Sequence, residues 1–169
     1  HSSTAIGILL ICFQNKQEEE EYAKRRTELI EAYQKGTGDE RLTAALSLSF
    51  GSSYEVLKAE YTDNEATVVL HAVEESTDEV AIRDYARDTV TLMSWVFGIP
   101  DVDKLSVTFR HTFLDTGGNE IQADAFIIGI SRENTTDINY ENFLDMVWND
   151  PSRLTDRADG YLITPALRE

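Results

Sequence analysis

The chain begins with an apolar segment that is followed closely by a strongly charged one. Residues 4–13 read TAIGILLICF, and residues 17–21 read QEEEE. Residues 14–34 are good helix formers without Gly or Pro, and their acidic residues precede the basic ones, an order that complements the helix dipole. The pattern predicts a charged, mostly solvated helix over 14–34, preceded by an anchor-like apolar segment and ended by Gly36-Thr37-Gly38.

A short helix and a β-hairpin are predicted next. Residues 39–48 are expected to be helical with Asp39 as the N-cap. Residues 54–61 and 66–73 are predicted strands, joined by a two-residue turn at Asp63-Asn64. This register would bury one face made of Leu57, Ala59, Tyr61, Ala66, Val68 and Leu70.

The strongest helix signal follows at residues 76–97. Ser76 and Glu79 fit a capping box, in which each side chain satisfies a backbone N–H at the start of the helix. Gly98 and Pro100 end the helix. The broad apolar stripe consists of Val80, Ile82, Tyr85, Ala86, Thr89, Leu92, Met93 and Val96, and the polar side carries Arg83, Asp84, Arg87 and Asp88.

A second hairpin is predicted from two alternating segments, 105–114 and 121–130. Taking Gly117-Gly118 as a two-residue loop fixes the strand register. The cross-strand pairs are then Leu105 with Ile130, Val107 with Ile128, Phe109 with Phe126, and His111 with Asp124.

The end of the chain is expected to be a helix over 140–147 and an irregular tail over 161–167 that lies on the domain. The order hairpin, helix, hairpin, helix predicts an α+β fold with a four-stranded antiparallel sheet and helices on one face, preceded by an N-terminal helix. We expect two parts: residues 1–38, the apolar segment and charged helix, and residues 39–169, a single α+β domain.

Charge narrows the classes of partner. The chain has 31 Asp and Glu against 15 Lys and Arg, a formal net charge of -16. Such a surface repels phosphate backbones, so we expect no nucleic-acid partner and no attraction to anionic membrane surfaces.

The one cysteine, Cys12, lies near the end of the apolar run, which excludes an internal disulfide and a cysteine metal cluster. Its position after Leu9-Leu10-Ile11 is similar to that of the lipidated residue of a lipobox, although a lipobox has a small residue where Ile11 stands. Cys12 is therefore a lipidation candidate. The alternatives are an apolar residue inside a membrane helix that extends upstream, or inside a buried strand; ten apolar residues alone do not span a bilayer, which takes about 20.

Catalytic chemistry has one weak candidate pair. The predicted neighbours His111 and Asp124 are a component of many catalytic sites, and also a common structural pair between strands. Three scattered His residues argue against a zinc site, and no phosphate loop, nucleophile elbow or dinucleotide fingerprint is present. We expect no catalytic activity, no cofactor and no metal.

The C-terminal part of the chain resembles a group of small, uncharacterised extracytoplasmic proteins and lipoproteins of Gram-positive type. The similarity rests on three segments in the last 70 or so residues: Phe113-Leu114-Asp115 with Gly118-Asn119-Glu120, Tyr140-Glu141-Asn142-Phe143, and residues 158–167, which read ADGYLITPAL. The group has no established activity. The resemblance implies an extracytoplasmic location and a fold rather than a reaction.

The sequence is compatible with three functions. The leading hypothesis is a non-catalytic, membrane-tethered extracytoplasmic binding domain, with Trp148 and Tyr161 as candidate interaction residues for an unknown protein partner. The second is a structural subunit whose apolar N-terminus packs against identical or different chains, since so dense an apolar run must be covered. The third is a hydrolase or isomerase that uses His111 and Asp124.

Overall fold

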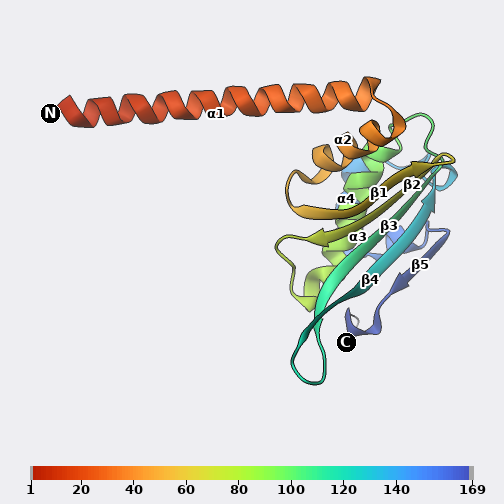
Figure 1. Ribbon diagram of the computed structural model, residues 1–169. Helices are drawn as coiled ribbons and strands as arrows, with labels where there is room; N and C mark the ends of the chain where they lie inside the picture. Colours follow the sequence, from red (N-terminus) through yellow and green to blue (C-terminus); the bar gives the residue numbers. More distant parts are fainter. Residues whose placement is uncertain (1, 168–169) are drawn as a thin grey trace.

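The computed structural model describes residues 2–167 as a long helix joined to an α+β domain (Figure 1). The helices are α1 (Ser2–Lys35), α2 (Gly38–Phe50), α3 (Asp78–Val96), α4 (Tyr140–Asn149) and α5 (Ser152–Thr155), with short 3-10 helices at Arg132–Asn134 and Pro165–Leu167. The strands are β1 (Tyr54–Thr62), β2 (Glu65–Ala72), β3 (Lys104–Leu114), β4 (Glu120–Ser131) and β5 (Gly160–Ile163).

Helix α1 includes the apolar run as well as the predicted charged helix, and most of it projects beyond the domain (Figure 1). Only its last turns dock. The Tyr33 hydroxyl donates to the Trp95 carbonyl at 2.6 Å, and the two rings meet edge to face. Among the described residues, no helix combines the length and the apolar character that crossing a membrane requires.

The sheet has five strands in the order β1-β2-β3-β4-β5, which corrects the predicted four-stranded antiparallel arrangement. Strands β2 and β3 are parallel, because α3 carries the chain back along the sheet and Lys104 enters beside Glu65. The fifth strand pairs antiparallel with β4 and overlaps residues 161–167, which were predicted to be an irregular tail. Helices α3 and α4 cover one face of the sheet (Figure 1).

The first hairpin confirms the predicted two-residue turn. Asp63 and Asn64 both have positive φ, 53° and 62°, as a turn that follows the twist of its strands requires. Tyr61 pairs with Ala66 as predicted. A register shift between Val56 and Lys58 removes Leu57 from the predicted face, and its side chain is 43% exposed.

Both predicted N-caps are wrong by one or two positions. Helix α2 is capped by Thr37, whose hydroxyl accepts from the Glu40 N–H, while the Asp39 carboxylate accepts from the backbone of Tyr61. Helix α3 begins after Thr77, and the Ser76 hydroxyl donates to Asp84 instead of closing a capping box. In both cases the predicted capping residue has another hydrogen-bond partner: Asp39 accepts from strand β1, and Ser76 donates to a side chain of α3.

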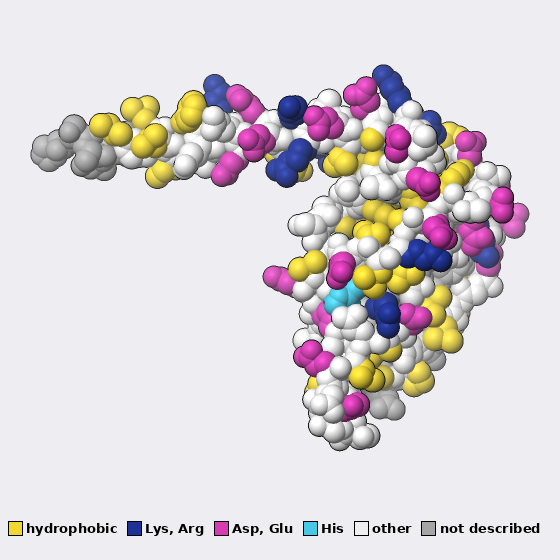
Figure 2. Space-filling view, in the orientation of Figure 1, with side chains coloured by type: hydrophobic (Ala, Val, Ile, Leu, Met, Phe, Trp, Pro, Cys, Tyr) yellow, Lys and Arg dark blue, Asp and Glu magenta, His cyan; other side chains and the backbone are white. Residues whose placement is uncertain are grey.

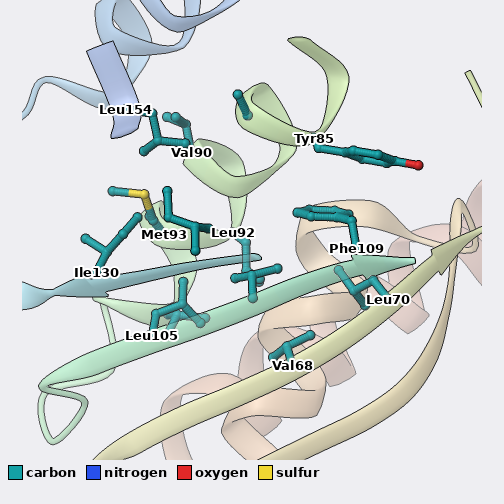
Figure 3. Packing of buried hydrophobic residues seen from close by; sticks show 14 of the residues in the cluster. Val68, Leu70, Tyr85, Val90, Leu92, Met93, Leu105, Phe109, Ile130 and Leu154 are labelled. Carbon is teal, nitrogen blue, oxygen red and sulfur yellow. The ribbon is translucent and has the colours of Figure 1, made fainter. Parts of the chain in front are cut away.

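The core lies between α3 and the sheet, as the apolar stripe predicted (Figure 3). Tyr85 stacks on Phe109 with ring centroids 4.6 Å apart, and Phe126 contacts Phe109 edge to face. Of the predicted stripe, Val80 is exposed and Ile82 is half-buried; the buried members are Tyr85, Ala86, Thr89, Leu92, Met93 and Val96.

Candidate binding site

The position of His111 corrects the one catalytic pair expected from the sequence. Strands β3 and β4 pair as predicted from Leu105 to Phe109, but a bulge follows, so that Asp124 lies opposite Arg110 and Ala123 lies opposite His111. The loop is also longer than two residues, because Leu114 already pairs with Glu120. His111 and Asp124 therefore do not form a pair.

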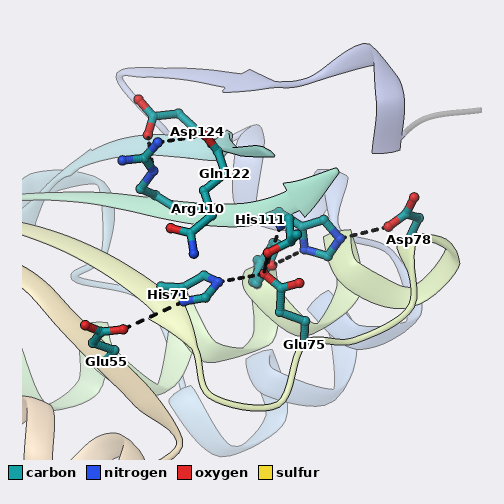
Figure 4. A network of polar contacts seen from close by, with 10 residues as sticks. Glu55, His71, Glu75, Asp78, Arg110, His111, Gln122 and Asp124 are labelled. Carbon is teal, nitrogen blue, oxygen red and sulfur yellow. Dashed lines mark hydrogen bonds and ion pairs between the residues drawn. The ribbon is translucent and has the colours of Figure 1, made fainter. Parts of the chain in front are cut away.

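His111 instead connects β3 to α3. Strand alternation turns its ring into the core, where it is 1% exposed. Its Nδ1 lies 2.6 Å from the Tyr85 hydroxyl, and its Nε2 lies 2.8 Å from Oδ1 of Asp78 in the first turn of α3 (Figure 4). A neutral ring satisfies both contacts, with Nδ1 accepting from Tyr85 and Nε2 donating to Asp78.

The Asp78–His111–Tyr85 arrangement resembles a relay in outline but lacks a usable nucleophile. Burial, followed by the negative charges of Glu75 and Asp84, raises the pKa of the Tyr85 hydroxyl well above its usual range. Tyr85 is itself only 1% exposed, so its oxygen is neither ionised nor accessible at neutral pH. These three side chains hold the first turns of α3 against the sheet.

A second polar cluster lies beside it on the strand ends (Figure 4). One oxygen of Glu75 accepts from the backbone and hydroxyl of Thr112, both at 2.9 Å, and lies 2.8 Å from Nε2 of His71. On β3 and β4, Arg110 pairs with Asp124 at 3.6 Å. Within residues 2–167, no three His, Cys or carboxylate side chains converge in a way that could hold a metal ion.

The polar cavity of greatest chemical interest lies where the end of α2, the start of β1 and the end of β2 meet α3. Its volume is about 280 Å³. Its walls combine the aromatic rings of Phe50, Tyr54 and Tyr85 with three carboxylates, three serines and one arginine: Glu74, Asp84, Asp88, Ser49, Ser53, Ser76 and Arg87.

Asp88 is the desolvated carboxylate of this cavity. It accepts a short hydrogen bond from the Tyr54 hydroxyl, and one of its oxygens lies 3.5 Å from Nε of Arg87. Burial raises the pKa of the Asp88 carboxyl, although the hydrogen bond from Tyr54 and the charge of Arg87 act in the opposite direction. The cavity thus holds a carboxylate whose lost hydration its neighbours only partly replace.

Asp88 gives a pH test with a definite sign. Its raised pKa means that the folded protein loses stability relative to the unfolded chain as pH rises from about 4 through that pKa. Asp88→Asn removes this ionisation, and its amide oxygen still accepts from Tyr54. We expect the difference in the free energy of unfolding, variant minus wild type, to become more positive as pH rises from about 4 to 8. Urea denaturation at stepped pH measures this difference.

Asp115→Asn is the control with the opposite sign. The backbone N–H groups of Asn119 and Gly117 lower the pKa of the Asp115 carboxyl, so wild-type protein loses this contribution only as pH falls below about 4. A relative stability of Asp88→Asn that is flat or falls with rising pH would contradict the account of Asp88.

The other candidates from the sequence lie far apart along the chain. Cys12 is exposed on α1. Trp148 on α4 is half-buried with the Arg87 guanidinium 4.8 Å from its ring, and Tyr161 on β5 is 51% exposed. The sequence analysis placed Asp84 and Asp88 on the polar side of the helix; their spacing of four residues was the signal that they share one face.

Comparison with known proteins adds no relatives: the chain matches no family model, no curated protein and no solved structure. The site is therefore interpreted from its own geometry.

Proposed function

We propose that this protein is a non-catalytic binding domain tethered to a membrane by the apolar end of α1, on the extracytoplasmic side. The observation that carries the proposal is the exposure of the apolar segment, which we define as residues 6–13. Its large side chains are 57–69% exposed: Ile6, Ile8, Leu9, Leu10, Ile11 and Phe13. Figure 2 shows hydrophobic side chains along the described part of α1 that projects away from the domain.

The distribution of these side chains around α1 favours lipid over a single partner helix. Successive residues in an α-helix are about 100° apart, so Ile6 and Ile8 point in nearly opposite directions. A partner helix covers one stripe, whereas a helix that is apolar on all sides requires an apolar environment on all sides. Lipid provides that environment.

The rest of α1 fits the role of a spacer. Residues 14–28 are exposed and mostly polar, and a helix of that length extends about 20 Å. The docking of Tyr33 on Trp95 then fixes the direction from which the spacer reaches the domain. The net charge of -16 keeps the domain itself away from anionic headgroups.

The absence of catalysis is part of the proposal. It is supported by the burial of His111 and Tyr85 and by the separation of His111 from Asp124. The polar cavity on α3 is the candidate binding site, because it places hydrogen-bonding and aromatic groups in one accessible hollow.

Co-flotation with phosphatidylcholine vesicles tests the tether. We expect the wild-type chain to float with the vesicles and Leu9→Glu/Leu10→Glu to remain at the bottom, because two carboxylates in the apolar segment oppose insertion. Gln14→Glu/Gln17→Glu is the matched control, since it adds the same charge to the spacer and should float like wild type.

Two other results would contradict the lipid tether. Wild-type protein that stays out of the vesicle fraction and forms concentration-dependent oligomers, lost in Leu9→Glu/Leu10→Glu, would support the structural-subunit alternative. Equal flotation of both double variants would mean that the apolar segment is not the tether. The intact mass of native protein from the membrane fraction separates a lipid attached at Cys12 from insertion of the unmodified segment.

A further inference from the structure

A groove lies in the angle between α1 and the end of α2, and its volume is about 470 Å³. Helix α1 passes over α2 and then extends beyond the domain (Figure 1). We call this hollow the spacer groove. It is lined mainly by Tyr22, Arg25, Arg26 and Leu29 of α1 and by Ser47 and Leu48 of α2.

The apolar part of the spacer groove comes from both helices. Tyr22 and Leu29 are seven residues apart, two turns of α1, so they share one face of the helix. Tyr22 is 63% exposed, and Leu29 and Leu48 are half-buried. An apolar strip between two helices is a surface on which an amphipathic helix packs.

Two arginines give the spacer groove its charge. Arg25 and Arg26 are exposed, and within residues 2–167 neither takes part in an ion pair, whereas Arg87 and Arg157 are each paired with aspartate. Among the described lining residues of the groove there is no carboxylate. Residues 24–26 are also the longest run of basic residues in a chain of net charge -16. The groove is therefore locally positive on an acidic protein.

Charge and shape together select the kind of partner. A small anion would pair with the arginines but leave the apolar strip uncovered, whereas a helix with an apolar stripe and flanking carboxylates covers the strip and pairs with the arginines. At 0.15 M salt, charges more than about 8 Å away are largely screened. The adjacent arginines rather than the distant acidic surface then set the attraction.

We propose that the spacer groove binds an acidic amphipathic helix of a partner protein. The apolar stripe of that helix packs on Tyr22, Leu29 and Leu48, and its carboxylates pair with Arg25 and Arg26. The inference goes beyond the tethered binding domain proposed above, because it adds a surface separate from the polar cavity on α3. A helix bound there contacts α1 and α2 together and fixes the angle between the spacer and the domain.

Fluorescence anisotropy at 0.15 M salt tests the inference with a labelled helical peptide of about 18 residues, long enough to form a helix. Its apolar stripe is Leu, and its other positions are Glu and Gln. The protein is the full chain carrying Leu9→Glu/Leu10→Glu, so that the peptide does not collect on the apolar segment. A neutral peptide with every Glu replaced by Gln should bind about fivefold more weakly, because the charge pairs are missing.

Substitutions on α1 locate the binding, and all the side chains concerned are exposed, so folding is not at risk. Arg25→Gln/Arg26→Gln should weaken binding of the acidic peptide about fivefold. Lys16→Gln/Lys24→Gln is the matched control, since it removes the same charge from α1 outside the groove lining and should leave binding unchanged. Tyr22→Ser should weaken binding of both peptides about threefold, because the apolar contact is common to them.

Three results would overturn the inference. Equal affinity for the acidic and neutral peptides would remove the role of charge, and equal losses in the two double variants would reduce it to net charge. The third is flotation of the Leu9→Glu/Leu10→Glu chain with phosphatidylglycerol vesicles that depends on Arg25 and Arg26, without binding of the acidic peptide. The arginines would then serve anionic headgroups.

Flotation of the wild-type chain with phosphatidylcholine vesicles separates this inference from the tether. A wild-type chain that floats, with no binding of the acidic peptide, retains the tether and loses the groove. Binding of the peptide without flotation of the wild-type chain retains the groove and loses the tether.

Discussion

Phe109→Ala should lower the free energy of unfolding by about 3–5 kcal/mol, the largest effect expected of any substitution considered for this protein. Phe109 is fully buried and stacks on Tyr85 (Figure 3). It also meets Phe126 and Tyr54 edge to face. Alanine leaves a void between α3 and the sheet that rigid neighbouring rings cannot fill. Urea denaturation followed by circular dichroism measures the loss.

Phe113→Ala is the matched control, because it removes the same atoms from the same face of β3. Phe113 lies near the hairpin tip and is only half-buried. Its loss of stability should therefore be clearly smaller. Equal losses at both positions, or a loss below about 1 kcal/mol at Phe109, would show that the core is not centred on this ring.

Periodicity was sufficient to predict the parts of the fold in which one pattern continues without interruption. The stripe of α3 and the alternation of β3 set the buried faces, and the Asp63-Asn64 turn set the register of the first hairpin because its residues accept positive φ. Each of these depends on neighbours in the sequence, and sequence analysis detects such local signals.

The direction of β3 and the presence of β5 depend on contacts between distant residues. Parallel pairing of β2 with β3 follows from the path of α3 across the sheet, and β5 gains its partner only after β4 is in place. Residues 160–163 alone carry too short a pattern to predict a strand. Such contacts leave little trace in a local pattern.

In the candidate site, too, the local pattern and the contacts between distant residues gave different answers. A single bulge at Ala125, between the exposed Asp124 and the buried Phe126 of β4, shifts the register by one residue and separates His111 from Asp124. Nothing in the alternation of residues 121–130 indicates where an extra residue lies. The partners that His111 actually meets, Asp78 and Tyr85, come from another element, so the geometry of the helix on the sheet was needed to find them.

Because His111 joins β3 to α3, replacing it should have the second large effect on stability. His111→Ala should lower the free energy of unfolding by about 2–4 kcal/mol, because it creates a void and leaves the buried Tyr85 hydroxyl without its partner. His71→Ala is the control, since His71 bonds a carboxylate but its side chain is 17% exposed and water can replace it, so its loss should be clearly smaller.

Asp78→Asn separates a structural imidazole from a reactive one. The Asn oxygen can still accept from Nε2 of His111, and the Asp78 side chain is 61% exposed, so the loss of stability should stay below about 1 kcal/mol. If His111 only joins β3 to α3, it tolerates this change, because the Asn side chain keeps the hydrogen bond and no negative charge is needed there. If His111→Ala left stability unchanged, the connection of α3 to β3 would have to come from the aromatic stack alone, and the buried ring would need another purpose.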